Sequence, residues 1–467
     1  MSLRRPNGFI SAGFNPLEVP NAPTIGTASI AGPTSVSVTF TAPSNVGGSA
    51  ITGYVATARK TSDGTTISGT GASSPVTISG LTTGTAYTVT VAAVNSFGLG
   101  LSSAASNSVT PVAYYLYSWG YNDGILGLNN TAQQSSPAQV GALTSWSQIS
   151  VSYHSLAVKL DGTLWSWGRN GYGQLGLNDR YNTRSSPVQV GALTTWSKVT
   201  TANNNSLAIK TDGTMWAWGK NVNGSLGLGN TTYYSSPKQV GALTAWSKVS
   251  AGNNFCAAIK TDGTMWSWGL NDGGQLGIGN TYTRNSPVQV GALTTWSEVS
   301  CGQKSCLALK TDGTLWSWGY RFNGQGNLGL GDNISRSSPT QIGALTTWSQ
   351  ISTGSYHSLA TKTDGALWAW GSAAQGQLGG NNTSPNRYSP VQIGALTDWL
   401  KPSAGKQNSL CVKTDGTLWV WGRGTNGRLG LNSTTYFSSP VQVGSDTTWV
   451  SAIQPQTSLS ALAIKTS

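Results

Sequence analysis

The chain has 467 residues and a formal net charge of +12, yet only 9% of its residues are charged, against roughly a quarter in average soluble domains. Its 60 glycines and its strong apolar alternation exclude a disordered polymer and indicate a turn-rich β protein with an uncharged polar surface. No long apolar run and no secretory leader core occur, so the sequence predicts neither membrane insertion nor classical export.

Residues 1–22 contain three prolines and two glycines among scattered apolar side chains. A segment this short cannot build a core of its own. We expect an extended arm that becomes ordered against another subunit of a multimeric assembly. A flexible tail is the alternative. The candidate anchors of the arm are Phe9, Ile10, Phe14 and Leu17.

Residues 23–111 hold seven short alternating runs with turn signals between them, which predicts a β-sandwich. The segment resembles a fibronectin type III domain, because Leu81 and Tyr87 have the spacing of that family's tyrosine corner and residues 93–98 match its last hairpin. The usual core tryptophan is missing, and Phe40 is our candidate replacement. The resemblance implies a domain that spaces and presents its neighbours.

Residues 112–467 are built on a repeated (Trp/Tyr)-x-Trp-Gly motif. All 20 tryptophans belong to its seven copies or to the GALT-x-W segment, or its variant, that follows each copy. A fixed period of about 50 residues in β-rich sequence indicates a propeller with one blade per repeat. The glycines that close the motif are Gly120, Gly168, Gly219, Gly269, Gly319, Gly371 and Gly422.

The two ends of the repeat array complement each other. The first copy, at residues 114–120, has no strand before it, and the last strand, at residues 460–467, has none after it. Pairing them closes a ring and removes two exposed sheet edges. The sequence therefore predicts an all-β protein, with a fibronectin type III-like β-sandwich followed by a seven-bladed β-propeller closed by the C-terminal strand.

Four strands are expected in each repeat, and in the second repeat they are 186–191, 196–200, 206–210 and 214–219. Strand alternation puts Trp165 and Trp167 on one face, opposite small residues such as Ala157. This arrangement favours tryptophans packed between blades over tryptophans that stack on carbohydrate.

The repeats also resemble the regulator of chromosome condensation 1 repeat, most clearly at residues 206–229 and 267–280. The resemblance covers residues 113–467 and implies a seven-bladed propeller. The family's prototype is a nucleotide exchange factor for a small GTPase that also binds chromatin, and this activity depends on an inserted β-wedge and a basic N-terminal tail. The even motif spacing leaves no room for a wedge, so we do not carry the exchange activity over.

Charges, cysteines and histidines follow the same period. Lysines from Lys159 to Lys465 recur at one strand position, and aspartates from Asp161 to Asp415 follow two residues later, which predicts local turn and cross-strand charges. The cysteines fill slots that hold small residues in other repeats, which predicts buried free thiols at Cys256, Cys301, Cys306 and Cys411.

The sequence offers no constellation for catalysis. The two histidines, His154 and His357, occupy equivalent repeat positions and lack further metal ligands, and Glu298 is the only glutamate of the propeller. No phosphate-binding loop or nucleophile elbow occurs. We expect no enzyme, no metal and no cofactor. The positive charge favours an anionic partner, but without basic runs nucleic acid is not expected.

The loop before the Ser-Pro pair of each repeat departs from the period and is rich in tyrosine, arginine and asparagine, a composition suited to recognition. Ordinary exposed loop residues are the alternative. A second ring follows each Trp-Gly pair, from Tyr121 to Arg423. The candidate binding residues are Arg180, Tyr181, Arg184, Tyr233, Tyr234, Tyr282, Arg284, Arg336, Arg387, Tyr388, Tyr436 and Phe437.

The layout of arm, sandwich and propeller resembles bacteriophage tail-fibre, baseplate or capsid-decoration proteins. We therefore expect a non-enzymatic virion protein whose arm and sandwich contact other virion proteins and whose propeller contacts a polysaccharide or protein of the host surface. A bacterial cell-surface adhesin is the first alternative, and a scaffold resembling the exchange factor is the second. The predicted domains are 1–22, 23–111 and 112–467.

Overall fold

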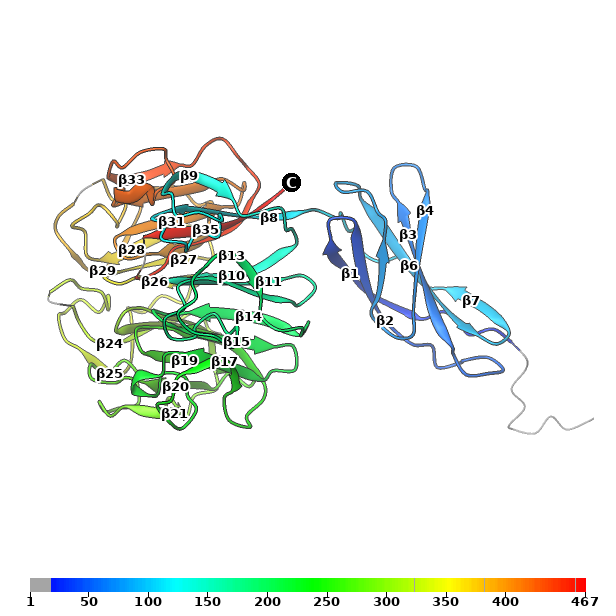
Figure 1. Cartoon of the computed structure of the whole chain (residues 1–467), viewed down its shortest axis with the longest axis horizontal. Helices are drawn as coiled ribbons and strands as arrows, with labels where there is room; N and C mark the ends of the chain where they lie inside the picture. The colour runs from blue at the N-terminus through cyan, green and yellow to red at the C-terminus, as the bar shows by residue number, and fades with distance from the viewer. Residues whose placement is uncertain (1–17, 323, 382, 458) are drawn as a thin grey trace, which may run out of the picture. The chain divides into compact units, whose positions relative to one another are not determined.

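The computed structural model describes residues 18–322, 324–381, 383–457 and 459–467, which divide after Ala113 into a sandwich unit and a propeller unit (Figure 1). Phe9, Ile10, Phe14 and Leu17, the predicted anchors of the arm, lie outside the described residues. No helix among the described residues is long and apolar enough to cross a membrane.

The last residues of the predicted arm belong to the sandwich instead. The carbonyl of Glu18 accepts the N–H of Gly48 (3.0 Å) and the side-chain amide of Asn95 (2.9 Å). The N–H of Asn21 donates to the carbonyl of Asn45 (3.1 Å). These bonds attach residues 18–21 to the loops beside the sandwich strands.

The sandwich unit consists of two antiparallel sheets. One has the order β1-β2-β5, and its strands are β1 (Thr24–Gly32), β2 (Ser35–Thr41) and β5 (Val76–Ser79). The other has the order β4-β3-β6-β7, with β3 (Gly53–Lys60), β4 (Thr66–Gly71), β6 (Tyr87–Asn95) and β7 (Gly98–Ser102). Alternation buries one face of each sheet. In β2, for example, Val36, Val38 and Phe40 are buried and the residues between them are not.

Two specific expectations for the sandwich are confirmed. The hydroxyl of Tyr87 accepts the N–H of Thr82 (3.1 Å), which is the hydrogen bond of a tyrosine corner. The ring of Phe40 is buried and lies 4.6 Å, centroid to centroid, from the ring of Tyr54. Phe40 therefore fills part of the core where the family's tryptophan is missing.

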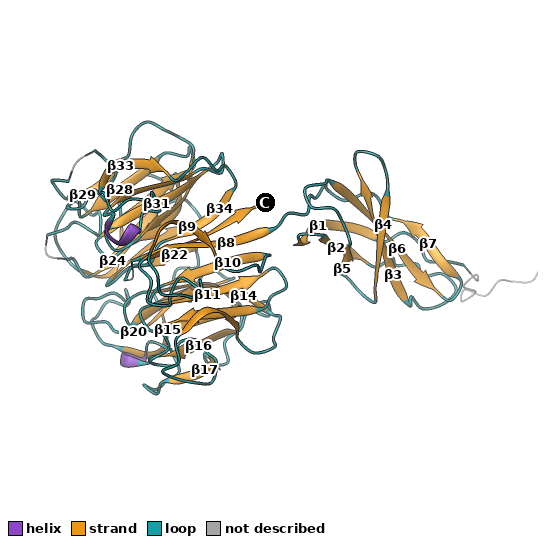
Figure 2. Cartoon of the chain, turned by 45° about the horizontal axis from the view of Figure 1, so that its top comes forward, coloured by secondary structure: helices purple, strands orange, loops and turns teal. Residues whose placement is uncertain are grey.

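Over the described residues, the propeller unit forms seven four-stranded antiparallel sheets, and nearly all of its regular structure is strand (Figure 2). From the channel outward, the first two blades are β10 (Trp146–Val151), β11 (His154–Lys159), β12 (Leu164–Gly168), β13 (Arg184–Gln189), and β14 (Trp196–Thr201), β15 (Asn205–Lys210), β16 (Met215–Gly219), β17 (Tyr234–Gln239). The next two are β18 (Trp246–Ala251), β19 (Phe255–Lys260), β20 (Met265–Gly269), β21 (Arg284–Gln289), and β22 (Trp296–Cys301), β23 (Ser305–Lys310), β24 (Leu315–Gly319), β25 (Arg336–Gln341).

The remaining blades follow the same order. Two of them are β26 (Trp348–Thr353), β27 (His357–Lys362), β28 (Leu367–Gly371), β29 (Arg387–Gln392), and β30 (Trp399–Ala404), β31 (Asn408–Lys413), β32 (Leu418–Gly422), β33 (Phe437–Gln442). The seam blade is β34 (Trp449–Ile453), β35 (Ser460–Thr466), β8 (Tyr114–Gly120), β9 (Gln134–Gln139). Two short 3-10 turns lie in loops, η1 (Val222–Gly224) and η2 (Thr425–Gly427).

The seam blade confirms the predicted closure. β35 pairs antiparallel with β8, with Ala463 opposite Tyr117 and Ser460 opposite Gly120. The C-terminus supplies two strands of this sheet and the start of the repeat array supplies the other two, so the ring has no free sheet edge at its seam.

The expected grouping of strands within a repeat is wrong in one respect. The segment 186–191, taken as the first strand of the second repeat, lies mostly in β13, which pairs with β12 of the preceding blade through Trp165 and Gln189. Each sheet therefore begins at the GALT-x-W tryptophan and ends with the Ser-Pro strand. The long loop that follows each Trp-Gly pair joins the third and fourth strands of a single blade.

The tryptophans fill the space between blades, as predicted. Trp196 lies edge-on to Trp216 (6.2 Å) and Trp218 (6.3 Å) of its own blade, and this trio packs on Leu156 and Leu164 of the preceding blade. The indole N–H of Trp218 donates to the carbonyl of Gln174 in that preceding blade (2.9 Å). Equivalent bonds are donated by Trp119, Trp268, Trp318, Trp370 and Trp421.

The periodic lysines have a contact that sequence patterns did not indicate. The Nζ of Lys210 lies 4.0 Å from the ring centroid of Trp216 and 5.0 Å from that of Trp196, a cation–π arrangement that recurs in other blades. The periodic aspartates do hold the turns, because the carboxylate of Asp212 accepts both the N–H (2.8 Å) and the hydroxyl (2.7 Å) of Thr214.

The innermost strands are tied together by serine hydroxyls that accept backbone N–H groups of the next blade. Ser150 accepts from Thr201 (2.8 Å), and the same bond recurs at Ser250, Ser300, Ser352 and Ser403. Residues 454–457, between β34 and β35, cross the channel at one end. The side chain of Gln456 donates to the carbonyl of Cys301, and its own carbonyl accepts the hydroxyl of Ser355, two contacts with different blades.

A matched pair of substitutions measures the contribution of the indole–carbonyl hydrogen bond to the free energy of unfolding. Trp218 and Trp167 are equivalent and fully buried, but the indole N–H of Trp167 has no hydrogen-bond partner among the described residues. We expect Trp218→Phe to lower the free energy of unfolding by about 1 kcal/mol more than Trp167→Phe, because both lose the same volume and only one loses a hydrogen bond. Urea unfolding curves measure the difference, and equal losses would contradict it.

Candidate functional site

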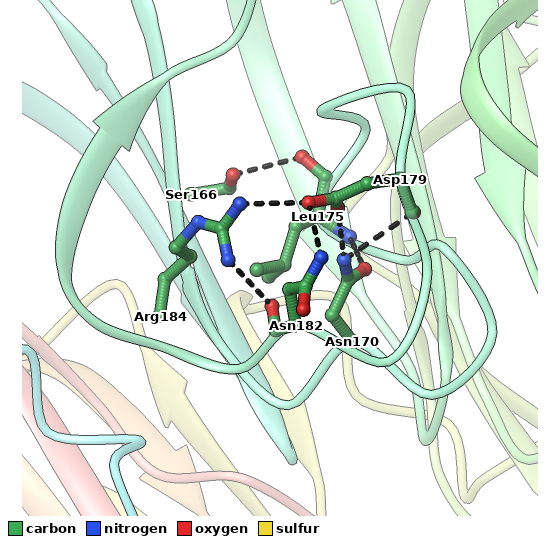
Figure 3. A network of polar contacts seen from close by, with 6 residues as sticks. All are labelled: Ser166, Asn170, Leu175, Asp179, Asn182 and Arg184. Carbon is green, nitrogen blue, oxygen red and sulfur yellow. Dashed lines mark hydrogen bonds and ion pairs between the residues drawn. The ribbon is translucent and has the colours of Figure 1, made fainter.

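The candidate site is the set of long loops that join the third and fourth strands of the blades. In the loop 169–183, the side-chain oxygen of Asn170 accepts the N–H of Leu175 (3.1 Å), while its amide donates to the carboxylate of Asp179 (2.5 Å) (Figure 3). Arg184 donates to the same carboxylate (2.7 Å) and to the carbonyl of Asn182 (3.2 Å). The loop is thus held in one shape from within.

Other blades repeat this support. The side-chain oxygen of Asn221 accepts the N–H of Leu226 (2.8 Å), and that of Asn271 accepts the N–H of Leu276 (2.9 Å). Their amides donate to the carbonyls of Asn230 and Asn280 (both 2.9 Å). The loops differ in sequence at their tips but share a fixed base.

A glycine allows each of these loops to begin. Gly219, at the end of β16, has φ +98°, and a Cβ there would lie 2.5 Å from the carbonyl oxygen of Asn204, just before the neighbouring strand β15. Only glycine fits this backbone without strain. The Trp-Gly motif therefore marks the point where the chain leaves the sheet for the variable loop.

The structure places the twelve predicted residues in two groups. Six are the first residues of outermost strands, each paired with a glycine of the Trp-Gly motif, and they are Arg184, Tyr234, Arg284, Arg336, Arg387 and Phe437. Tyr388 is the second residue of β29, and the loops hold Arg180, Tyr181, Tyr233, Tyr282 and Tyr436. All twelve lie at the same edge of the propeller, because the blades are equivalent.

Several of the twelve side chains pack against, or form hydrogen bonds with, other parts of the propeller. Phe437 and Tyr234 are partly buried and pack against hydrophobic clusters between blades. The hydroxyl of Tyr388 donates to the carbonyl of Gly324 (2.5 Å) in the preceding blade. Arg180 donates to the carbonyl of Tyr233 in the next blade (2.6 Å).

Three tyrosines remain well exposed. Tyr181 is 81% exposed, Tyr282 is 68% exposed and Tyr436 is 45% exposed. We call Tyr181, Tyr282 and Tyr436 the exposed tyrosines. A phenol with this exposure on a supported loop offers apolar area and one hydrogen bond at little cost in conformational entropy.

The second ring makes aromatic–cation contacts on the same edge. The Nζ of Lys220 lies 4.8 Å from the ring centroid of Tyr172, which meets Tyr233 edge-on at 5.7 Å. The ring of Phe322 stands edge-on to both Tyr320 and Tyr356, at 5.5 Å from each. Phe322 and Tyr356 are not marked by the repeat, and only their spatial neighbours reveal them.

The two histidines make contacts between neighbouring blades. His154 and His357 are buried, and each bonds through Nε2 to a serine hydroxyl of the next blade, Ser206 or Ser409 (both 2.7 Å). Burial lowers the pKa of each imidazole to about 3. Among the described residues no group of three or more histidine, cysteine, aspartate or glutamate side chains could hold a metal ion. The four cysteines are buried and free, as predicted.

The buried histidines predict a loss of stability in mild acid. Their folded-state pKa of about 3 lies below the ordinary value of 6.5. Between these two pH values the histidines are protonated in the unfolded chain and neutral in the folded chain. The contribution of each histidine to stability is complete above pH 6.5 and falls toward pH 3, by about 1.4 kcal/mol per pH unit.

The double variant His154→Asn, His357→Asn isolates this effect. Asn205 and Asn408 already occupy the equivalent strand position in other blades, so asparagine is compatible with the fold. We expect the variant's urea midpoint to fall less than that of the parent between pH 7 and pH 5. An identical fall in both proteins would mean that other groups carry the acid sensitivity.

Family models match both units of the chain. The regulator of chromosome condensation (RCC1) repeat model matches residues 161–209, 212–259, 262–309, 312–361, 364–412 and 415–453. The fibronectin type III domain model matches residues 21–109.

Two curated proteins illustrate the sequence similarity. The ultraviolet-B receptor UVR8 of Arabidopsis thaliana is 32% identical over 326 residues, which are 68% of this chain and 62% of the receptor. The E3 ubiquitin-protein ligase HERC2 of Homo sapiens is 34% identical over 110 residues, 22% of this chain and 2% of the ligase. The chain thus spans less than two thirds of the length of either relative.

Solved propellers share the fold at low identity. Yeast RCC1 (Prp20), in its complex with Kap60, has a TM-score of 0.66 at 20% identity and covers 76% of this chain and 89% of its own. Prp20p from Saccharomyces cerevisiae, studied for its binding to Gsp1p and histones, has the same score and identity. Human WBSCR16 has a TM-score of 0.66 at 18% identity, covering 76% and 98%. These likenesses concern the fold alone.

Proposed function

We propose that this chain, which belongs to the regulator of chromosome condensation (RCC1) repeat family and carries a fibronectin type III domain, is a non-enzymatic binding protein whose propeller presents its loop edge to a protein partner. The exposed tyrosines carry the proposal. They lie on loops that are supported by internal hydrogen bonds, whereas many of the surrounding aromatic and polar side chains are buried or bonded to other parts of the propeller.

Protein binding fits the relatives. Prp20, whose propeller shares this fold, has been solved with Kap60 bound to it and has been described for its binding to Gsp1p and histones. The loop edge adds tyrosine and arginine side chains, which are enriched in the centres of protein interfaces. The burial of both histidines supports the non-enzymatic part of the proposal.

The triple variant Tyr181→Ala, Tyr282→Ala, Tyr436→Ala tests the loop edge. Affinity capture from an extract of the source cells, read by quantitative mass spectrometry, should lose at least about tenfold of a partner held by these side chains, since truncating an interface anchor costs about 2 kcal/mol. The control is Leu143→Ala, Leu193→Ala, Leu243→Ala, which removes three exposed apolar side chains from the opposite edge. Equal capture by the parent and the tyrosine variant would refute the proposal.

We also propose the finer assignment that the layout suggested, a bacteriophage virion protein made in the host cytoplasm, whose propeller faces the host surface. None of the relatives named above is a virion protein, so this assignment rests on the layout of the chain. Mass spectrometry of purified virions tests it, with a variant lacking residues 1–17 expected to be left out of the particle. Absence of the parent protein from the particles would refute a virion role and leave the bacterial cell surface as the alternative.

A further inference from the structure

Two apolar grooves lie on the outer rim of the propeller, each between a blade and its successor. The first has a volume of about 450 Å³ and lies between β29 and the blade of β30–β33, where it is lined by Leu396, Trp399, Trp419 and Pro440. The second has about 430 Å³ and lies between β21 and the blade of β22–β25, with Leu293, Trp296, Trp316 and Pro339 in the same places. We call these two sites the rim grooves.

Each rim groove contains one ionisable side chain, and it is an arginine. Arg387 lines the first groove and Arg284 lines the second. Among the described residues neither guanidinium has an ion-pair or hydrogen-bond partner, and Arg284 only faces the ring of Tyr282 at 5.9 Å. An arginine beside apolar walls, without an internal carboxylate, leaves a positive charge for a ligand to neutralise.

The equivalent arginines of other blades show what the rim grooves lack. Arg184 is paired with Asp179 (2.7 Å), and Arg336 is paired with Asp332 (2.5 Å). In the sequence the position of these aspartates holds Asn280 and Asn382 in the two blades with rim grooves. The same strand position thus bears an internally neutralised arginine in two blades and an unneutralised one in two others.

The seam offers a further contrast. The groove there, of about 420 Å³, is lined by Tyr117, Pro137 and Trp449, but it has no arginine, and Asp446 occupies the place of the leucine. In the second rim groove a lysine adds to the positive potential from behind the tryptophan, since the Nζ of Lys310 lies 3.7 Å from the ring centroid of Trp316, whereas Lys413 behind Trp419 of the first groove is paired with Asp398 (3.2 Å). Asp446 is itself paired with Lys465 (2.7 Å), so the seam groove offers no free positive charge for the carboxylate that the rim grooves favour.

We propose that the rim grooves bind an extended acidic segment of a partner protein, in which a carboxylate bonds to Arg284 or Arg387 and a neighbouring aliphatic side chain packs against Trp316 or Trp419. The inference depends on the proposed function only in taking the partner to be a protein, and its surface meets the exposed tyrosines only where Tyr282 faces Arg284.

The lining of the grooves favours a peptide over a polysaccharide. Apart from the arginine, the first groove offers mainly aliphatic walls such as Val391 and Ile393, and Leu396 is 51% exposed. A sugar chain presents a hydroxyl at almost every carbon and needs many polar partners, whereas an aliphatic side chain next to a carboxylate matches apolar walls with one guanidinium.

Fluorescence polarisation with the full chain tests the proposal. The probe is a labelled peptide, Gly-Ser-Glu-Leu-Glu-Leu-Ser-Gly, and its partner control has both glutamates replaced by glutamine. We expect saturable binding of the acidic peptide that weakens with salt, and at least about tenfold weaker binding of the glutamine peptide, because a charge-assisted bond to arginine contributes about 1.5–3 kcal/mol.

Two arginine pairs provide matched variants. Arg284→Gln, Arg387→Gln should weaken binding of the acidic peptide at least about tenfold, whereas Arg184→Gln, Arg336→Gln, with the same change in net charge, should stay within about twofold of the parent, because those arginines are already neutralised. Leu293→Asp, Leu396→Asp, which places a carboxylate in each rim groove together with its arginine, should also weaken binding at least about tenfold. Circular dichroism checks that each variant is folded.

Four results would overturn the proposal: no saturable binding to the parent, equal binding of the glutamine peptide, equal losses in the two arginine variants, or displacement of the peptide by oligogalacturonate at lower concentration than by unlabelled peptide. The Tyr181→Ala, Tyr436→Ala variant, which keeps Tyr282 beside Arg284, should bind the peptide like the parent. Failure of the rim grooves is therefore distinguishable from failure of the loop edge.

Discussion

The propeller depends on the interaction of one tryptophan with the blade before it. The indole of Trp218 donates its N–H to the carbonyl of Gln174, and the absence of a side chain on Gly176, where a Cβ would lie 2.8 Å from Nε1, lets the loop approach the ring. The carbonyl belongs to the long loop of the preceding blade. The packing between blades and the conformation of the loop are therefore coupled, so a substitution of the buried ring would alter the loop at the exposed edge.

This coupling explains how near-identical repeats can carry differences. Because the base of the loop 220–233 is held by Asn221 and by the indole of Trp268 in the next blade, substitutions at its tip leave the hydrogen-bonded base intact. Arg184 has an aspartate partner, whereas Arg387, at the equivalent strand position, has none in the described part of the chain. Specificity in such a ring can come from removing an internal partner as readily as from adding a new side chain.

Much of the architecture was predictable because its signals are local or periodic. The period of the Trp-Gly motif predicted the blades, the unmatched ends predicted the pairing of β35 with β8, and the spacing of Leu81 and Tyr87 predicted the bond between Tyr87 and Thr82. The assignment of the Ser-Pro strand to the preceding sheet, the lysines over the indoles and the rim grooves were missed. These features depend on which blades and strands touch, which a single sequence pattern does not contain.

The closure of the ring has a consequence for circular permutation. The seam is the one sheet of the described propeller whose strands come from both ends of the array, while every other sheet is built from continuous chain. A permuted chain opened in a GALT segment between blades and joined across residues 467 and 114 would have seven continuous sheets. Its last blade would then dock on the first only through indole contacts and serine bonds. Strand exchange at the seam thus ties the two ends together with a backbone ladder that no other blade boundary has.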